Sequence, residues 1–281
     1  MSTGPATAIL FPGQGSQTAD MRDTIERERP DLLALVIDAV GEDPFLRAGE
    51  GTNFAQPAIF AASLAGWHAL GRPAGAFMAG HSLGELAALV AAGALAEADG
   101  VGLVTLRGRV MDASGRAAGN GGMVAVLGPS AAERAPEVAL AHRLSIANDN
   151  SPQQVVLSGS RHELPGAIEH AEDLGLRAME LDVTGAFHSP MMASAVPEFA
   201  AALAATDFAA PAVTVLSAVT AQPFTDPARQ LADALTMPVR WRETMLALQQ
   251  RGASRFVEVG PGRVLTGLAR RTLSDVELVH A

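Results

Sequence analysis

The chain has 281 residues, enough to bury a sizeable core and to form one large domain or a domain with an insertion. A hydrophobic content of 48% favours a globular protein over a disordered one, and the lack of cysteine excludes disulfides and thiolate metal sites. The net charge of −10 disfavours general binding to nucleic acid, although a local arginine patch remains possible. The N-terminal residues do not resemble a secretory signal, and the most apolar stretch, 76–95, contains His81 and Glu85, so a membrane span is not expected. We therefore expect a cytoplasmic enzyme or binding protein.

Short apolar runs alternate with helical patterns over much of the chain. Residues 8–11 predict a buried strand that ends in a glycine-rich turn, and residues 56–70 have helical spacing. A second buried strand is predicted at 75–80, followed by a helix from Leu83. The C-terminal part repeats the alternation, with strands at 212–219 and 255–260, the end of a helix at 245–252 and a helix at 262–271. This order predicts an α/β protein with a parallel sheet covered by helices on both faces.

The middle of the chain has a different order of elements. It reads as a strand, a helix interrupted by Pro136, two strands joined at 149–152, a second helix and a final strand. The order β-α-β-β-α-β is that of the ferredoxin-like motif. We therefore predict a large α/β domain built from residues 1–121 and 185–281, with a small ferredoxin-like subdomain inserted at 122–184.

The pattern Gly-x-Ser-x-Gly surrounds Ser82, directly after the second predicted strand. Between a strand and a helix, this pattern is typical of a sharp turn that lifts a serine hydroxyl clear of the sheet. The unpaired N–H groups of the following helix can hold a developing oxyanion. A simpler interpretation is a helix start with Ser82 as its N-cap. We favour Ser82 as a nucleophile.

A serine nucleophile needs a base, and His188 is the best candidate among the seven histidines. It follows a predicted strand and precedes a helix that Ser189 would cap and Pro190 would open. A helix N-terminus disfavours the imidazolium form, which suits a neutral base. His81 adjoins Ser82, but the tight turn should direct its side chain elsewhere. From the residues alone, a packed loop histidine is an equally good interpretation of His188.

Arg107 lies on the apolar face of a helix predicted at 99–114. Its neighbours three and four residues away are Leu103, Val104, Val110 and Met111. Burying a guanidinium without a partner costs several kcal/mol, so a carboxylate is expected beside it. That carboxylate could be an internal Asp or Glu, which spacing alone slightly favours, or it could belong to a substrate held in a bidentate pair.

Seven segments follow one another along the chain in an order that resembles a known family. They are FPGQGSQ, GHSLGE, LRGRVM, ANDNSPQQVVLSG, AFHS, PVRW and VEVGPGRVLTGL. Together they are similar to the malonyl-CoA:acyl carrier protein transacylases and to the related acyltransferase domains of polyketide synthases. The resemblance covers residues 9 to about 271. It implies an α/β-hydrolase-like core with an inserted ferredoxin-like subdomain.

The resemblance also implies roles for individual residues. Ser82 would carry the malonyl group as an ester, with His188 as general base and acid. Arg107 would pair with the free carboxylate of the malonyl unit, and the backbone N–H groups of Gln14 and Leu83 would form the oxyanion hole. The implied reaction is ping-pong: malonyl-CoA acylates the serine, and the phosphopantetheine thiol of an acyl carrier protein then takes the acyl group. No metal or redox cofactor is implied.

Two positions bear on how selective and how fast the enzyme would be. Phe187 resembles the malonyl-selective members, because a bulky residue there would exclude a methyl branch, a difference of about 1–3 kcal/mol. The family commonly has a glutamine ahead of the P-V-x-W segment that helps to orient the histidine, and here that position is Ala234. If a main-chain carbonyl orients His188, the change is tolerable; if a side chain is needed, turnover is slower.

Docking of an acidic carrier protein would require local positive charge. The candidates are Arg240, Arg242, Arg263, Arg270 and Arg271. Three alternative functions stay open. One is a serine esterase or thioesterase, another is a non-catalytic module that binds a carrier. The third is a trans-acting polyketide-type acyltransferase or a malonate decarboxylase transacylase subunit.

Overall fold

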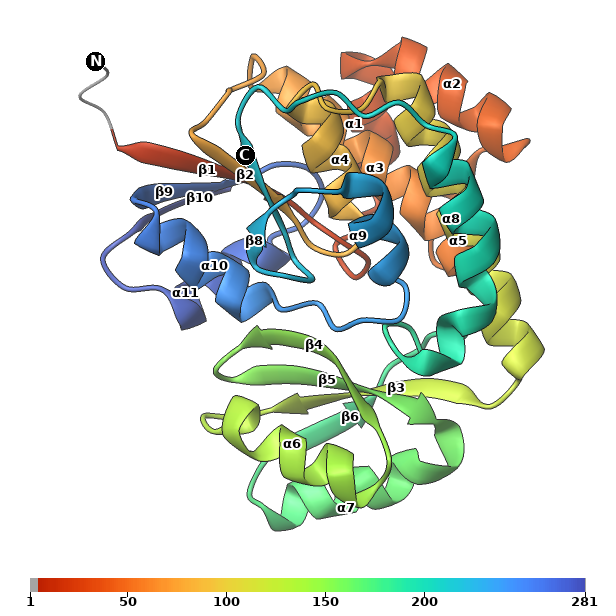
Figure 1. Cartoon of the computed structure of the whole chain (residues 1–281), viewed down its shortest axis with the longest axis vertical. Coiled ribbons are helices and arrows are strands. Elements are labelled where there is room, and N and C mark those ends of the chain that lie inside the picture. The colour runs from red at the N-terminus through yellow and green to blue at the C-terminus, as the bar shows by residue number, and fades with distance from the viewer. Residues whose placement is uncertain (1–4, 281) are drawn as a thin grey trace.

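The computed structural model describes residues 5–280, which form a larger and a smaller part (Figure 1). The larger part contains a six-stranded sheet in the order β10-β9-β1-β2-β7-β8, and the smaller part contains a four-stranded sheet in the order β4-β5-β3-β6. The chain is therefore α/β with two sheets of different type, as the sequence predicts.

The six-stranded sheet is parallel except for its last strand, which pairs antiparallel with its neighbour. Its strands are β1 Ala6–Phe11, β2 Phe77–Gly80, β7 Thr214–Ser217, β8 Gln222–Pro223, β9 Ala253–Glu258 and β10 Glu277–His280. Strand β1 shows why residues 8–11 are apolar at every position: Ile9 and Phe11 face one side and Leu10 the other, and all three are at most 1% exposed. A parallel sheet covered on both faces requires such a continuous apolar run.

Helices cover both faces of this sheet. They are α1 Met21–Glu28, α2 Pro30–Val40, η1 Pro44–Arg47, α3 Thr52–Ala69, α4 Gly84–Ala91, α5 Glu97–Ala118, η3 Pro190–Ala195, α8 Val196–Ala204, α9 Pro227–Asp233, α10 Trp241–Gln250 and α11 Val264–Thr272. Ile9 and Phe11 belong to a core with residues of α1 to α5, whereas Leu10 belongs to a second core with residues of α10 and α11. No helix within residues 5–280 is long and apolar enough to cross a membrane.

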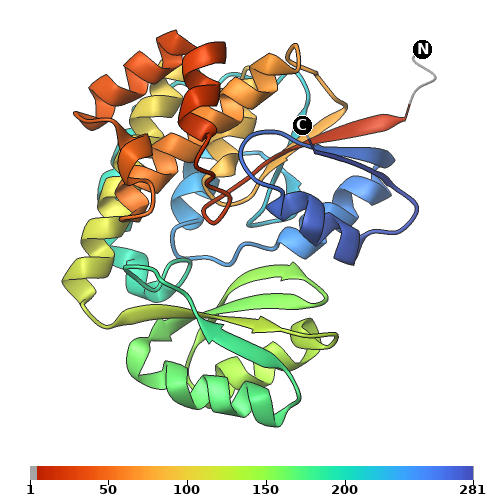
Figure 2. The same cartoon turned by 180° about the vertical axis from the view of Figure 1, so that it is seen from behind.

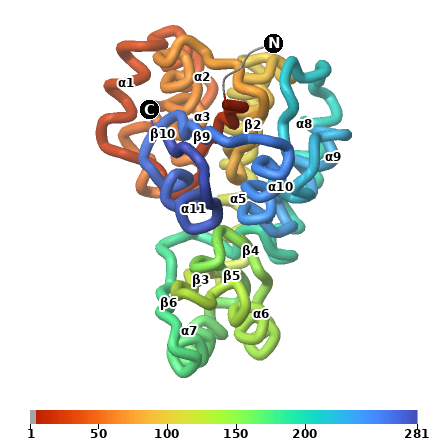
Figure 3. Tube along the Cα trace, turned by 90° about the vertical axis from the view of Figure 1, so that its left-hand side faces the viewer, coloured from red at the N-terminus to blue at the C-terminus, as the bar shows by residue number. Residues whose placement is uncertain are grey.

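The smaller sheet is antiparallel throughout. Its elements are β3 Gly121–Leu127, α6 Ala131–Ala141, β4 Ser145–Ser151, β5 Gln154–Ser160, η2 Arg161–Glu163, α7 Leu164–Asp173 and β6 Arg177–Glu180. Val124 and Val126 face α6 and α7, while Met123 and Ala125 face the core of the larger part. Figures 1 and 3 show both helices on the side of the sheet away from the larger part. The order of elements is the predicted ferredoxin-like one, and the division at 122–184 stays a prediction.

The structure differs from the sequence-based prediction at Pro136 and in several elements that the sequence pattern did not predict. The expected interruption at Pro136 is wrong, because α6 continues through this residue. Ala135 and Val138, on either side of the proline, are fully buried against the small sheet, and this packing outweighs the one backbone hydrogen bond that proline removes. The sequence analysis did not predict five of the α-helices and strands, namely α1, α2, α9, β8 and β10. In α1 only Met21 and Ile25 are buried, too few to form a clear apolar stripe.

Helix α5 links the two parts: it packs on α3 and then leads into β3, the yellow-green passage in Figure 2. The chain returns from β6 through residues 181–187. Strand β4 lies against α10 and α11, so the small sheet meets the larger part beside these two helices (Figure 1).

Candidate active site

Ser82 lies on a sharp turn between β2 and α4, with a left-handed backbone (φ +54°). The glycines on either side permit this turn. A Cβ on Gly80 would lie 1.9 Å from the carbonyl carbon of Gly84, and a Cβ on Gly84 would lie 2.2 Å from the carbonyl oxygen of Phe11. The N-cap interpretation is wrong, because the Ser82 hydroxyl bonds to other side chains and caps no backbone N–H of α4. The hydroxyl is presented above the carboxyl end of the sheet.

His188 lies beside this hydroxyl, with Nε2 2.8 Å from Ser82 Oγ. Its side chain is held from the other end, where Nδ1 lies 2.8 Å from the carbonyl oxygen of Ala234 and 3.2 Å from that of Met237. Carbonyl oxygens only accept hydrogen bonds, so Nδ1 carries the proton and Nε2 is free to accept one from the serine. The residue that follows, Ser189, caps η3 by accepting from the N–H of Met191, as the sequence predicts for this turn.

The surroundings of His188 keep its ring neutral. Burial, then the positive charge of Arg107 and the nearby His81, together lower its pKa to about 3 from an ordinary value of about 6.5. The hydrogen bonds to Ala234 and Met237 act in the opposite direction and do not offset this. At neutral pH the imidazole is therefore uncharged, with Nε2 free to accept a proton. An uncharged imidazole that is hydrogen-bonded to a hydroxyl can act as a general base.

Arg107 is 3% exposed and reaches the same hydroxyl. Its Nη2 donates to Ser82 Oγ at 3.1 Å, and its Nη1 donates to Gln56 Oε1 at 2.6 Å. No acidic side chain among residues 5–280 forms an ion pair with it; Glu85, also buried, acts on it only through space. Burial lowers the pKa of Arg107 to about 10, so the guanidinium is charged at neutral pH. The internal ion pair that spacing slightly favoured is therefore not formed.

A series of hydrogen-bonded side chains holds this guanidinium in place, and it was not predicted from the sequence. Gln56 Nε2 donates to Thr52 Oγ1 at 2.8 Å, and Thr52 Oγ1 donates to Gln14 Oε1 at 2.8 Å. Thr52 and Gln56 are one helical turn apart on α3 and at most 1% exposed. Two polar residues on the buried face of an apolar helix were the available signal. These hydrogen bonds connect Arg107 to the glycine-rich turn after β1.

The backbone N–H groups of Gln14 and Leu83 have no acceptor within residues 5–280, and both residues line the cavity above Ser82. Leu83 directly precedes the first turn of α4, where N–H groups point out of the helix. Two unpaired amide donors beside a nucleophile could bind a developing oxyanion.

A cavity of about 400 Å³ is lined by all six residues for which the sequence suggested a catalytic or substrate-binding role, which are Gln14, Ser82, Leu83, Arg107, Phe187 and His188. Phe187 is 6% exposed and lines it. The small sheet also contributes to the walls, with Asn148, Asn150, Gln154 and Val156. The cavity therefore lies between the two parts of the chain, and segments more than 100 residues apart meet in it.

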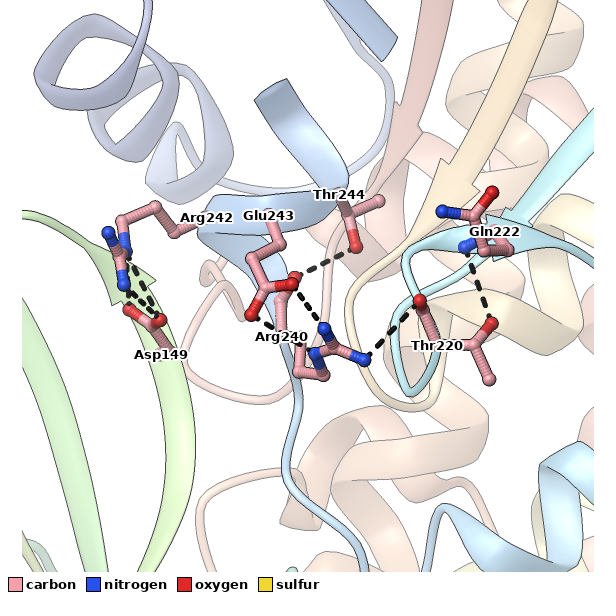
Figure 4. A network of polar contacts seen from close by, with 7 residues as sticks. All are labelled: Asp149, Thr220, Gln222, Arg240, Arg242, Glu243 and Thr244. Atoms are coloured by element: carbon pink, nitrogen blue, oxygen red, sulfur yellow. Dashed lines mark hydrogen bonds and ion pairs between the residues drawn. The ribbon is translucent and has the colours of Figure 1, made fainter. Parts of the chain in front are cut away.

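The remaining candidates fall into two groups. His81 turns away from Ser82, as expected, and its Nε2 lies 2.8 Å from Asn150 Oδ1. Arg240 pairs with Glu243, and Arg242 forms a bidentate pair with Asp149 of β4 (Figure 4). The three arginines of the α11 region, by contrast, are exposed: Arg263, Arg270 and Arg271.

A serine on a strand–turn–helix elbow, a neutral histidine and two free amide donors are typical of α/β enzymes that move acyl groups through a serine ester. Comparison with known proteins agrees with this class. The model of the "Acyl transferase domain" family matches residues 9–280, and the chain belongs to this family of acyltransferases.

Relatives and solved structures of similar architecture cover nearly the whole chain. The chain is 40% identical over 95% of its length to the polyketide biosynthesis protein ThaF of Burkholderia thailandensis, of which it spans 24%. It is 36% identical to the polyketide biosynthesis malonyl CoA-acyl carrier protein transacylase BaeC of Bacillus velezensis, over 95% of this chain and 97% of BaeC. The crystal structure of a malonyl-CoA:acyl carrier protein transacylase from Xanthomonas oryzae superposes with a TM-score of 0.89 at 34% identity, over 99% of this chain and 95% of that one.

Proposed function

We propose that the protein transfers a malonyl group from malonyl-CoA to the phosphopantetheine thiol of an acyl carrier protein, through an ester on Ser82. One observation carries the choice of acyl group: the buried Arg107 guanidinium has no acidic partner among residues 5–280 and lies within hydrogen-bond distance of the nucleophile. A charge buried in this way needs a counter-ion, and the free carboxylate of a short diacid thioester supplies one. The names of the relatives support the same reaction.

The first half-reaction loads the serine. His188 Nε2 takes the hydroxyl proton of Ser82 as Oγ attacks the thioester carbonyl. The N–H groups of Gln14 and Leu83 bind the oxyanion of the tetrahedral intermediate. As the intermediate collapses, the carbon–sulfur bond breaks, and the proton held on His188 goes to the departing CoA sulfur.

The second half-reaction is the reverse, with a different thiol. The phosphopantetheine thiol of the carrier gives its proton to His188 and attacks the malonyl ester. The ester bond breaks, Ser82 recovers the proton, and a malonyl thioester leaves on the carrier. The side chains and backbone donors named here supply every step, so we propose that transfer needs no metal or redox cofactor.

Arg107 and Phe187 would together select the acyl group. The guanidinium would orient the carboxylate end of the malonyl unit, which places the carbonyl carbon over Ser82 Oγ. The Phe187 ring in the same cavity leaves little room for a branch on the α-carbon. We propose malonyl as the preferred unit, with the carrier belonging to fatty acid or polyketide assembly and the enzyme working in the cytoplasm on CoA thioesters.

Incubation with malonyl-CoA in the absence of a carrier tests this function. We expect one malonyl adduct per chain, mapped by mass spectrometry to Ser82, slow hydrolysis, and discharge on addition of a holo carrier protein. Ser82→Ala should form no adduct. Rapid CoA release without an adduct would instead indicate an esterase or thioesterase, and the absence of both adduct and CoA release would indicate a binding module. Acetyl-CoA serves as the matched substrate without a carboxylate.

A further inference from the structure

Strand β4 of the small sheet contacts both the turn that carries Ser82 and the segment that binds His188. Asn150, on β4, binds His81, the residue before Ser82, with 2.8 Å between Oδ1 and Nε2. Two residues earlier on the same strand, Asn148 forms a parallel β-bridge with Val239. Strand β4 therefore contacts two segments of the active site. One is the turn that carries Ser82, and the other is the segment around Val239, which follows the residues that bind His188.

The segment 234–240 holds His188 in place. Its carbonyl groups at Ala234 and Met237 accept from His188 Nδ1, so a shift of this segment moves the imidazole. Toward the larger sheet it is tied by the N–H of Arg240, which donates to the carbonyl of Ala218 at 2.7 Å. At its start it is tied to the end of α9, where the N–H of Ala234 donates to the carbonyl of Gln230 at 3.0 Å. Further along, Val239 ties it to β4.

Two backbone hydrogen bonds join this segment to β4. The N–H of Val239 donates to the carbonyl of Ala147 at 2.8 Å, and the carbonyl of Val239 accepts from the N–H of Asp149 at 2.9 Å. These are bonds between the two parts of the chain, and they position the segment relative to the small sheet.

The ion pair between Asp149 and Arg242 fixes the same contact from the side chains (Figure 4). Arg242, on the first turn of α10, donates from Nε to Asp149 Oδ1 at 2.9 Å and from Nη2 to Oδ2 at 2.7 Å. The Asp149 side chain is 17% exposed and the Arg242 side chain 33%. A bidentate pair with limited exposure restricts both direction and distance, unlike a single contact between mobile surface charges.

We propose that β4, fastened by the Asp149–Arg242 ion pair, sets the distance between Ser82 and His188, so that Asp149 and Arg242 are positioning residues of the transfer reaction. Neither side chain touches the reacting atoms. They act through segment 234–240 on the base and, through the strand they fasten, on the turn that carries the nucleophile. The small sheet thus aligns the two catalytic groups in addition to lining the cavity.

Because misplacement of reacting groups by about 1 Å can slow a reaction by about 10²-fold, loosening this contact should appear in the rate. We expect Asp149→Asn and Arg242→Met each to lower kcat by about tenfold while the KM for malonyl-CoA changes little, because neither residue lies in the acyl-binding site. The double variant should be no slower than either single variant, because both changes remove the same pair. Arg242→Lys keeps the charge but cannot form the bidentate pair, so its kcat should lie between that of the unaltered enzyme and that of Arg242→Met.

The matched control is Arg255→Met, which removes an ion pair with Glu277 between β9 and β10. It should leave kcat unchanged. Thermal unfolding of every variant separates positioning from stability: a purely structural role would lower the melting temperature without changing kcat per folded enzyme. That result, or additive losses in the double variant, would overturn the proposal.

This inference rests on the proposed acyl transfer, and the experiment keeps the two apart. The rate measured is single-turnover formation of the malonyl adduct on Ser82. If the unaltered protein forms no adduct, the proposed function fails. If it forms the adduct and the folded Asp149→Asn and Arg242→Met variants form it at the same rate, only the positioning role of the ion pair fails.

Discussion

His188 donates from Nδ1 to the main-chain carbonyl of Ala234 across 2.8 Å, where a carboxylate would be expected in a serine–histidine–aspartate triad. The carbonyl of Met237 lies 3.2 Å from the same nitrogen. Backbone groups therefore hold the ring, and the alanine side chain takes no part. The sequence has Ala234 where the family commonly has a glutamine that helps to orient the histidine. In this structure a main-chain carbonyl orients the histidine instead, so the change is tolerable.

The low pKa of His188 predicts how the rate depends on pH. Since burial and then Arg107 lower this pKa, the acid limb of kcat/KM should lie well below the ordinary histidine value of about 6.5. Arg107→Met removes a positive charge that disfavours imidazolium, so the His188 pKa rises and the limb moves to higher pH. The measurement is kcat/KM against pH with acetyl-CoA, which has no carboxylate to interact with position 107.

Arg109 provides the control for this profile. It lies two residues further along α5, is exposed, and pairs with Glu198, as expected for a surface charge. Arg109→Met should leave the acid limb where it is in the unaltered enzyme. An acid limb that stays in place in Arg107→Met would show that the guanidinium charge does not act on the base.

Gln56→Glu should weaken the preference for a diacid. The new carboxylate would lie where Gln56 Oε1 now accepts from Arg107 Nη1 at 2.6 Å, and it would pair with the guanidinium in place of the substrate. Arg107 would then no longer be a buried charge without a counter-ion, and the substrate carboxylate would face a like charge, so the ratio of kcat/KM for malonyl-CoA over acetyl-CoA should fall by about tenfold or more. Gln56→Met, which removes the support without adding charge, should lower the ratio less. Equal ratios in both variants would contradict this account of Gln56.

Phe187→Ser should relax the discrimination against a branched acyl unit. The ring is buried in the cavity that would hold the malonyl group, and its removal makes room for a methyl group on the α-carbon. A methyl group is worth about 1–3 kcal/mol in such a pocket, so the ratio of kcat/KM for malonyl-CoA over methylmalonyl-CoA should fall by about 10–200-fold. Competition between the two thioesters measures this ratio directly, and an unchanged value would place the selecting residue elsewhere.

Arg270→Glu/Arg271→Glu should weaken the reaction with the carrier and spare the loading of the serine. Both residues are exposed on α11, whose Val264, Leu265 and Leu268 line the cavity. We expect the KM for an acidic carrier to rise by about tenfold, with a weaker dependence on salt, because rim charges steer association. The rate of adduct formation from malonyl-CoA should not change.

Arg72→Glu is the control for this pair of changes. Arg72 is also exposed, but it precedes β2, at the end of the parallel sheet opposite Ser82. It should leave the KM for the carrier unchanged. If the three changes act alike, net charge alone would explain the effect, and α11 would lose its role in docking.

Local features of the sequence determined the elements and the nucleophile. The strands of the parallel sheet are recognisable because a strand covered on both faces must be apolar at every position, as Ile9, Leu10 and Phe11 are. The turn at Ser82 is recognisable because the close approach of Gly80 and Gly84 leaves no room for a Cβ. The residues that form the turn are close together in the sequence, so their pattern can be recognised there, although the group that excludes a Cβ on Gly84 is the carbonyl of Phe11 on β1. Helix α1 escaped recognition because its short apolar stripe is a weak local signal.

The tertiary structure alone decided what each functional group faces. Spacing could show that Arg107 is buried, but its helical neighbours gave no means of telling an internal acid from a substrate; the fold places Gln56 and Ser82 beside it. The residues that hold His188 are 46 and 49 positions away, and they act through carbonyl groups that every residue has. Since every residue has a carbonyl group, the residue type at such a position does not reveal that its backbone is an acceptor. The distance between remote segments depends on how whole helices and strands pack. The pattern of residues therefore specified the chemistry available, and packing specified its geometry.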